Sequence, residues 1–402
     1  MPDSNPTRAP RSASVVQPIA AGVVGSLTGF ASSFALLIAG LQAVGASAAE
    51  AASGLLILCV FQGVLAIVFG LRFRMPISFA WSTPGAALMV AAKGLTEDFS
   101  AAVGAFLLCG VLLVVTGLWP WLARAMTRIP KPIASGMLAG ILFPICLAPV
   151  LASVGETWWQ GLVIVLVWLV LARLAPRWAV PAAVVATAVV VAIAAGGNPL
   201  VGQSISPVVV FVMPSFDPFV LVSLGIPLYI VTMAGQFVPG FTVLHTFGYD
   251  QPPARAIFVG AGAATVVGSV FGAYTLNLSA ITAAMMAGPD AHPDRGRRWI
   301  ATFASGALYL VIGLGAGAAT ALVSASPPIL ITAIAGLALF GALAGAVTTA
   351  LEDPDHRLVA IVTFLVVASS VTIAGIGSAF WGLIVGALVM LWFRTRRVAT
   401  TP

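Results

Sequence analysis

The chain has 402 residues, of which 60% are hydrophobic and only 7% are charged, whereas roughly 25% of a typical soluble domain is charged. This composition excludes a soluble globular protein. The formal net charge of +6 comes from 18 Lys and Arg against 12 Asp and Glu. The basic residues lie in short clusters between apolar runs, without interleaved aromatic residues. They indicate orientation in a membrane, and no nucleic acid partner is expected.

Apolar stretches between polar breaks predict fourteen membrane spans, since one crossing of a bilayer needs about 20 residues. In chain order the spans are 18–42, 50–70, 76–93, 100–122, 132–151, 158–174, 179–195, 219–246, 254–272, 274–288, 298–323, 328–350, 357–374 and 377–394. The longest break, 196–218, separates the first seven spans from the second seven and is expected to be a linker. Residues 1–17 are polar, and no small-residue cleavage site follows them, so we expect a disordered cytoplasmic tail and no cleaved signal.

The positions of Lys and Arg test this count independently, because alternate loops differ in basic residues when the spans are assigned correctly. With the N-terminus inside, 17 of the 18 basic residues fall on the cytoplasmic side, and Lys93 falls on the other side. The cytoplasmic ones are Arg8, Arg11, Arg72, Arg74, Arg124, Arg128, Lys131, Arg173, Arg177, Arg255, Arg295, Arg297, Arg298, Arg357, Arg394, Arg396 and Arg397. We therefore expect a multi-pass protein of the bacterial inner membrane with both termini in the cytoplasm.

The third and tenth spans are interrupted by polar residues, and each is third in its group of seven. The third has Ser-Thr-Pro-Gly at its middle, from Ser82 to Gly85, and the tenth begins with Tyr-Thr-Leu-Asn-Leu-Ser at Tyr274. Interrupted spans at matching positions of two halves are typical of inverted-repeat transporters with a site near the membrane midplane. The predicted fold is an all-α polytopic membrane protein of two inverted seven-span repeats, with half-helices in spans 3 and 10.

The middle of the third span predicts a helix that begins inside the membrane. Pro84 suits the first helical position, and Ser82 or Thr83 can cap the helix. Such a helix start presents N–H groups and the positive end of its dipole, which together bind anions. The alternative is a proline kink in a continuous helix, which is common in membrane spans.

Polar residues in other spans are further candidates for lining a site. Thr275, Asn277 and Ser279 would supply the second half-helix start, although an interhelical hydrogen bond is the alternative role for Asn277. Gln236 is the single Gln, Asn or charged residue in the interior of the eighth span, since His245 lies near its cytoplasmic end. A buried amide needs partners that a cavity or a ligand would provide. In the first span, Gly29-Phe-Ala-Ser-Ser-Phe34 places two aromatic rings and two hydroxyls, including Ser33, at the corresponding depth. Phe30 and Phe34 are four residues apart and lie on one helix face, and core packing is the alternative role for this pair.

Titratable groups give little support to other functions. No carboxylate lies in the middle of a predicted span, so proton coupling has no obvious carrier, and His245 is the best candidate beside a packing role. Cys59, Cys109 and Cys146 lie in apolar runs without metal-ligand spacing, so we expect no disulfide and no metal site. The absence of nucleotide-binding and nucleophile motifs argues against a pump or an enzyme, and no cofactor is expected.

Two groups of residues in the interrupted spans have a recognisable pattern. They are Ile77-Ser-Phe-Ala-Trp-Ser-Thr-Pro-Gly-Ala-Ala87, and Phe271-Gly-Ala-Tyr-Thr-Leu-Asn-Leu-Ser-Ala-Ile-Thr-Ala-Ala284 followed by Gly288-Pro-Asp-Ala-His292 and Arg298-Trp-Ile300. Through these residues the chain resembles the benzoate/proton symporter family, within the wider uracil-permease and anion-exchanger fold. The resemblance covers residues 15 to 395. In nucleobase-carrying relatives a Glu occupies the eighth span, where this sequence has Gly235 and Gln236.

The resemblance implies a core domain of spans 1–4 and 8–11 and a gate domain of spans 5–7 and 12–14. It also implies two short strands, near Phe79–Thr83 and Ala273–Asn277, an elevator-like movement and a homodimer formed through the gate. The expected divisions are a tail at 1–17, core at 18–122, gate at 123–195, linker at 196–218, core at 219–323, gate at 324–394 and a tail at 395–402.

The expected function is proton-coupled uptake of benzoate or a similar aromatic carboxylate. The predicted binding residues are Phe30, Ser33, Trp81, Ser82, Thr83, Gly85, Gln236, Tyr274, Thr275, Asn277 and Ser279. The half-helix start and the amides would hold the charge, and the aromatic rings would flank the substrate ring. The alternatives are a carrier of another organic anion or of a nucleobase-like ring, an anion channel, and a membrane enzyme.

Overall fold

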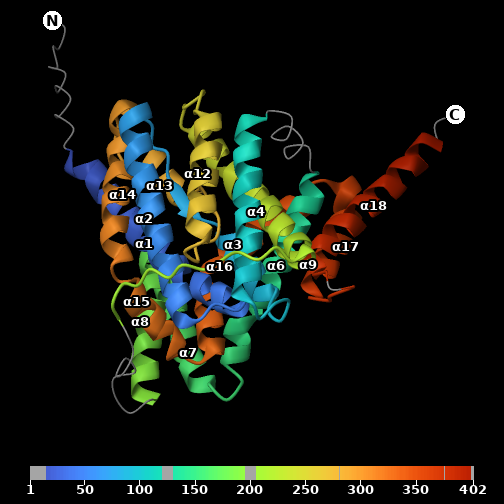
Figure 1. Ribbon diagram of the computed structural model, residues 1–402, viewed down its shortest axis with the longest axis horizontal. Coiled ribbons are helices and arrows are strands. Elements are labelled where there is room, and N and C mark those ends of the chain that lie inside the picture. Colours follow the sequence, from blue (N-terminus) through green and yellow to red (C-terminus); the bar gives the residue numbers. More distant parts are fainter. Residues whose placement is uncertain (1–14, 120–129, 195–204, 280, 375, 400–402) are drawn as a thin grey trace, which may run out of the picture.

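The computed structural model describes residues 15–119, 130–194, 205–279, 281–374 and 376–399, and these are mostly helical (Figure 1). Most of the predicted N-terminal tail and parts of the linker and the C-terminal tail lie outside these residues. So do the basic residues Arg8, Arg11, Arg124 and Arg128.

The first half of the chain forms long helices around one interrupted segment. The helices are α1 (Val16–Ala43), α2 (Ala48–Phe73), α3 (Thr83–Ala91), α4 (Phe99–Leu118), α6 (Lys131–Ala152), α7 (Trp158–Leu174) and α8 (Ala179–Ala194), with a short 3-10 turn at Pro176–Trp178. The strand β1 (Phe79–Trp81) directly precedes the short helix α3.

The second half begins with an extended stretch and repeats this pattern. Residues 218–246 form one continuous helix made of α9 (Pro218–Val220), η2 (Leu221–Gly225), α10 (Ile226–Thr232), η3 (Met233–Phe237) and α11 (Val238–Thr246). The remaining elements are α12 (Ala254–Ser269), β2 (Leu276–Leu278), α13 (Ile281–Ala287), α14 (Trp299–Gly313), α15 (Ala316–Ser324), α16 (Pro328–Leu351), α17 (Arg357–Ala368) and α18 (Ser378–Ala399), with 3-10 turns at Arg295–Arg297 and Pro354–His356.

Six of the described helices are long and apolar enough to cross a bilayer, or seven if the bent pair α14 and α15 forms one span. The predicted eleventh span is therefore broken, with a bend of 60° between its two helices. Four more apolar helices, α7, α8, α12 and the first part of α18, are shorter, at 10–17 residues. The architecture is thus an all-helical multi-pass membrane protein.

The two interrupted spans meet through their strands. β1 and β2 are antiparallel, with Phe79 opposite Leu278, Ala80 opposite Asn277 and Trp81 opposite Leu276. The strands implied by the resemblance are present, although the second lies a few residues later than expected. Each strand runs into a half-helix, α3 or α13, so the two halves of the chain join at this small sheet.

Close backbone contacts between glycines bring the long helices of the two halves together. A Cβ at Gly63 of α2 would lie 2.7 Å from the carbonyl oxygen of Gly306 on α14. A Cβ at Gly262 of α12 would lie 2.8 Å from the carbonyl oxygen of Gly110 on α4. Small residues allow such approach between membrane helices. The pairs α2 with α14 and α4 with α12 flank the strands, while α6 packs against α16 and α17.

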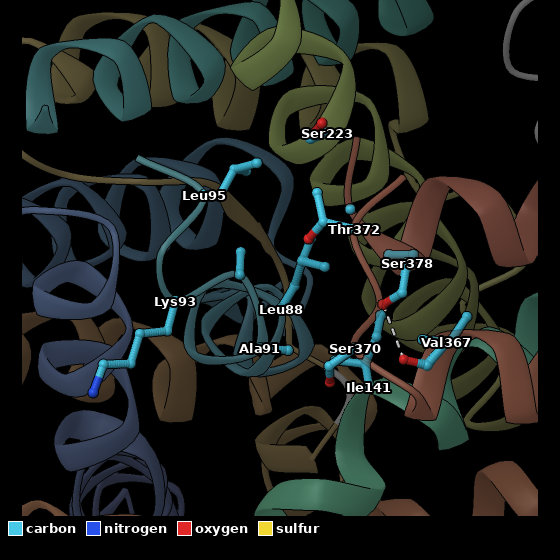
Figure 2. A pocket seen from close by; sticks show the side chains of 13 residues that line it. Leu88, Ala91, Lys93, Leu95, Ile141, Ser223, Val367, Ser370, Thr372 and Ser378 are labelled. Atoms are coloured by element: carbon cyan, nitrogen blue, oxygen red, sulfur yellow. Dashed lines mark hydrogen bonds between the residues drawn. The ribbon is translucent and has the colours of Figure 1, made fainter. Parts of the chain in front are cut away.

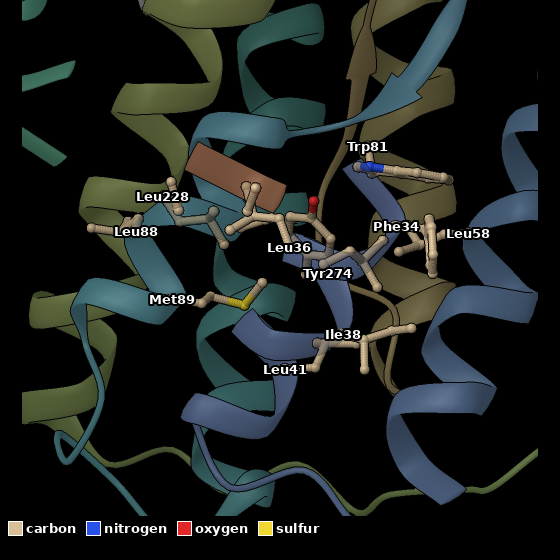
Figure 3. Close-up of a cluster of buried hydrophobic side chains, with 14 of the residues drawn as sticks. Phe34, Leu36, Ile38, Leu41, Leu58, Trp81, Leu88, Met89, Leu228 and Tyr274 are labelled. Atoms are coloured by element: carbon tan, nitrogen blue, oxygen red, sulfur yellow. The ribbon is translucent and has the colours of Figure 1, made fainter. Parts of the chain in front are cut away.

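The core surrounds the half-helix α3. Side chains from α1, α2, β1, α3 and α10 converge there, and Tyr274 reaches in from the segment before β2 (Figure 3). Leu88 and Met89 of α3 and Leu228 of α10 are at most 3% exposed. Pro84, Gly85 and Ala86 in the first turn of α3 are also buried, so the start of α3 lies inside the protein.

Candidate substrate-binding site

The start of α3 is built around the hydroxyl of Ser82. Ser82 is the N-cap residue, with an extended backbone, and its Oγ accepts the N–H of Gly85 at 3.1 Å. The same Oγ accepts a hydrogen bond from Thr232 Oγ1 at 2.9 Å. A Cβ at Gly85 would lie 2.6 Å from Leu228 Cδ1, so this position is tightly packed. Ser82 and Gly85 therefore define the helix start and do not line the cavity described below.

Tyr274 and Thr275, which precede β2, hydrogen-bond to Ser82, which follows β1, and so extend the pairing of the two strands. The Tyr274 hydroxyl donates to the carbonyl oxygen of Ser82 at 2.8 Å, and the Ser82 N–H donates to the carbonyl oxygen of Thr275 at 3.2 Å. Thr265 on α12 accepts the N–H of Leu276 at 3.0 Å. Both predicted residues are fully buried and lie outside the cavity lining.

A small cavity lies where α1, α2, α14 and the eighth-span helix meet the two half-helices. Its volume is about 30 Å³, and its lining residues are Gly29, Ser32, Ser33, Gln62, Ala80, Trp81, Thr83, Gln236, Ser279, Thr282 and Tyr309. A cavity that holds benzene is about 150 Å³. A ring-sized ligand therefore requires the surrounding elements to move apart.

An aromatic group forms one wall of this cavity. The indole Nε1 of Trp81 donates to Ser33 Oγ at 2.9 Å, and Ser33 donates to the carbonyl oxygen of Gly29 at 2.9 Å. Phe30 meets Trp81 edge to face, with ring centroids 6.1 Å apart, and Tyr309 meets Trp81 in the same way at 6.1 Å. The predicted residues Phe30, Ser33 and Trp81 are thus brought together.

The second half-helix adds hydroxyls to the cavity. Ser279 Oγ accepts the N–H of Thr282 at 3.1 Å, and the two hydroxyls are 2.6 Å apart. Asn277 is fully buried and does not line the cavity. Its Nδ2 donates to the carbonyl oxygen of Leu278 at 3.2 Å, while its Oδ1 reaches no partner.

Two amides face the cavity from opposite halves of the chain. Gln236 lies in η3, and Gln62 lies in the middle of α2. The sequence reasoning singled out Gln236 but missed Gln62, as well as Ser32, Thr282 and Tyr309. Gln62 is also an amide inside an apolar span, so the rule that found Gln236 would have found it. His245 is exposed near the end of α11 and does not line the cavity.

The cavity is uncharged. Among the residues that the structure describes, no Asp, Glu, His, Lys or Arg lines it, and no group of three metal-ligating side chains occurs in the described parts of the chain. A ligand in this cavity would meet hydroxyl, amide and indole groups.

A second cavity, of about 50 Å³, lies at the other end of α3 (Figure 2). Its polar lining residues include Ser223, Ser370, Thr372 and Ser378, and Ser378 donates to the carbonyl oxygen of Val367. Lys93 also lines this cavity, although its side chain points away from Thr372 and Ser378 in this view.

The loop after α13 is anchored by a buried arginine. Arg298 is 5% exposed, and its guanidinium donates to the carbonyl oxygens of His292 at 2.7 Å, Ala287 at 2.8 Å and Pro293 at 3.4 Å. Ala287 is the last residue of α13, so Arg298 satisfies a carbonyl at the end of this half-helix. His292, which reads as an ordinary loop residue in the sequence, is fully buried.

Comparisons with known proteins agree with this architecture. The family model described as benzoate membrane transport protein matches residues 12–391. The chain is 38% identical to inner membrane protein YdcO of Escherichia coli over 92% of this chain and 93% of that protein. It is 33% identical to the benzoate membrane transport protein of Acinetobacter baylyi, over 81% of this chain and 82% of that protein.

Solved structures with the same fold are transporters of anions. The transmembrane domain of a cyanobacterial bicarbonate transporter, BicA, matches with a TM-score of 0.58 and 15% identity over 92% of this chain and 97% of that one. The murine anion transporter Slc26a9, in an inward-facing state, matches with a TM-score of 0.63 and 13% identity over 97% of this chain and 70% of that one. At these identities the likeness establishes the fold alone.

Proposed function

This chain belongs to the benzoate membrane transport protein family, and from that membership we propose that it carries benzoate or a similar aromatic carboxylate into the cell. The observation that carries the proposal is the cavity between the half-helices. It combines an aromatic wall, formed by Trp81 and Tyr309 with Phe30 packed against Trp81, with hydroxyl and amide groups from both halves. Benzoate likewise combines a flat ring with a polar end.

We propose that uptake is coupled to protons. Moving one anion inward against a negative interior costs roughly 2.3 kcal/mol per 100 mV. Cotransport of one proton removes this cost and uses the inward proton gradient. The proposed location is the bacterial inner membrane, which is also named for the YdcO relative.

We also propose that the fourteen spans form two inverted repeats. In support, Gly262 follows Gly63 by 199 positions and Gly306 follows Gly110 by 196 positions. A shift of one repeat therefore turns the contact between α2 and α14 into the contact between α12 and α4. Fourteen crossings result when the two half-helices, the bent pair, the four shorter apolar helices and α17 are counted with the six long ones.

The proposed mechanism is an elevator-like movement of a core domain against a gate domain. The cavity is lined from α1, α2, β1 and the start of α3, the helix 218–246, the start of α13 and α14, while α6, α16, α17 and α18 contact one another. The small cavity volume fits a mechanism in which these groups separate to admit substrate. A homodimer through the gate domain belongs to the same proposal.

Uptake by proteoliposomes tests the proposal. We expect labelled benzoate to accumulate when an inward proton gradient is imposed, and to do so saturably. Trp81→Phe keeps a ring but loses the indole donor to Ser33, so its half-saturation concentration should rise about fivefold, equivalent to about 1 kcal/mol. Trp158→Phe, at an exposed tryptophan that begins α7, is the matched control.

Several results would contradict the proposal. If folded wild-type protein accumulates no benzoate, the substrate assignment is wrong, and competition by other carboxylates and nucleobases would identify the substrate class. Uptake that rises linearly without saturation would indicate a channel. If Trp81→Phe and Trp158→Phe change the half-saturation concentration equally, the cavity is not the substrate-binding site.

A further inference from the structure

Gln62 is a buried amide whose two polar atoms make no well-formed hydrogen bond. It lies near the middle of α2, is 1% exposed and lines the cavity. Both Nε2 and Oε1 lack a hydrogen bond, although the Tyr309 hydroxyl is near enough for a weak interaction. A buried amide that leaves both atoms unpaired destabilises the free protein. An amide that faces a cavity in this state is suited to a ligand with one donor and one acceptor.

The cavity offers little to stabilise a full negative charge. No cationic side chain lines it in the described chain. The first turn of α3 is largely occupied as well, because the N–H groups of Gly85 and Ala86 both donate to Ser82 and Pro84 has no N–H. An unpaired carboxylate in such surroundings is unfavourable, and burial favours its protonated form.

A protonated carboxyl group matches the free amide. Its O–H can donate to Gln62 Oε1 while its C=O accepts from Gln62 Nε2, which satisfies both unpaired atoms at once. We propose that the substrate binds as the neutral carboxylic acid, paired with Gln62, and that the transported proton travels on the substrate itself. This inference rests on the proposed function and specifies how its proton is carried.

The resulting cycle balances. Outside, the carboxylate takes one proton from the medium, and the neutral acid binds and crosses. Inside, the acid is released and loses the same proton, so one proton accompanies one substrate and no net charge moves. A protein carboxylate is then unnecessary for coupling, in keeping with the uncharged lining.

Other titratable groups near Gln62 do not offer an alternative carrier. The Tyr309 phenol lines the cavity, and the Cys59 thiol, one turn from Gln62 on α2, interacts with Tyr309. Both groups are ordinarily neutral at neutral pH. His245 is exposed on α11, away from the lining.

Equilibrium binding of labelled benzoate to the full-length protein in detergent tests this proposal. The neutral fraction of a carboxylic acid with a pKa of about 4.3 falls about tenfold per pH unit above that value. The apparent dissociation constant for total benzoate should therefore rise about a hundredfold from pH 5 to pH 7. Benzamide, which is neutral and has the same donor and acceptor pattern, should compete, while the permanent anion benzenesulfonate should not.

Substitution of Gln62 gives a second test. Gln62→Met has a similar size but no polar atoms, so it should weaken benzoate and benzamide binding at least about tenfold and leave the melting temperature without substrate equal or higher. Gln42→Met is the control. Gln42 lies on α1, away from the cavity, and donates to Ser324, so its loss should not weaken binding.

The outcomes separate this proposal from the proposed function. Binding that is independent of pH and blocked by benzenesulfonate would overturn the neutral acid while leaving benzoate transport intact. Wild-type affinity in Gln62→Met would contradict the pairing of the substrate with Gln62. If the melting temperature of this variant is also lower, Gln62 has a structural role. A protein that neither binds nor transports benzoate would contradict both.

Discussion

Trp81, Ser82 and Thr83 are consecutive, but their side chains have different partners. Trp81 and Thr83 line the cavity, whereas the Ser82 hydroxyl caps α3 and accepts a hydrogen bond from Thr232. Alternate residues of an extended segment point to opposite sides. The first and third of these residues therefore face the cavity in which the proposed substrate would bind, and the second defines the start of α3.

Loss of the Ser82 hydroxyl should reduce stability. Ser82→Ala removes the cap of Gly85 and leaves Thr232 without its acceptor, so we expect a loss of about 1–3 kcal/mol in the free energy of unfolding. The double variant Ser82→Ala/Thr232→Val should recover part of this loss, since both polar partners are then absent. Chemical unfolding in detergent measures it.

A helix cap far from the cavity provides a control, because its loss should lower stability without changing substrate binding. Asp98 caps α4 at an exposed position by accepting the N–H of Ser100 at 3.0 Å. Asp98→Ala should lower the free energy of unfolding by about 1 kcal/mol and leave benzoate affinity unchanged.

If the double variant Ser82→Ala/Thr232→Val is less stable than Ser82→Ala, the hydrogen bond assigned between Ser82 and Thr232 is contradicted.

The sequence allowed part of the site to be predicted. Ser33, Trp81, Thr83, Gln236 and Ser279 line the cavity as the spacing of polar residues in apolar spans suggested. The side on which a residue of β1 or β2 points could not be predicted, because it depends on the register of two strands far apart in sequence.

At the scale of elements, the sequence predicts the interruptions of spans 3 and 10, from Ser-Thr-Pro-Gly in the third and from the polar start of the tenth. It does not predict the break between α14 and α15, because the apolar run continues through Leu314 between Gly313 and Gly315. The wide helical turns η2 and η3 each end just before a proline, Pro227 or Pro239. Proline removes a backbone donor and clashes with the preceding turn, so the helix widens there.

The half-helix α13 depends on Arg298 at its end. Arg298→Lys cannot reproduce the fork that reaches three carbonyl oxygens, and a buried ammonium would be left with fewer partners. We expect a loss of about 2–4 kcal/mol in stability and slower benzoate uptake, measured by thermal unfolding and proteoliposome uptake.

The neighbouring arginine is a close control. The Arg297 side chain is 50% exposed and lies 3.8 Å from Asp294. Arg297→Lys should change stability by less than about 0.5 kcal/mol. If the two substitutions have equal effects, the buried contacts of Arg298 do not hold α13.

For the whole molecule, the proposed topology can be tested with the cysteines of the chain. Cys59, Cys109 and Cys146 are buried, so the wild type should react little with a membrane-impermeant maleimide. Lys93→Cys and Arg72→Cys introduce thiols at exposed positions that the topology places on opposite sides of the membrane. In intact cells the reagent should label Lys93→Cys, and in inverted vesicles Arg72→Cys.

In Figure 1, α1 begins and α18 ends toward the same upper side of the view, and the proposed topology places both ends in the cytoplasm. Labelling of both new thiols from the same side would contradict a membrane crossing by the third span, which contains β1 and α3. The number of crossings could not be fixed from hydropathy alone, because half-helices and bent pairs are shorter than a span.

The strand pair also has a consequence for how the protein is made. β1 ends at Trp81 and β2 begins at Leu276, so a ribosome working at about 5–20 residues per second needs about 10–40 s between them. During this interval the backbone groups of β1 have no strand to pair with, although unpaired backbone groups are costly within a membrane. The nascent first half is therefore an unfinished intermediate, and we expect the insertion machinery or a membrane chaperone to shield β1 until the second half arrives.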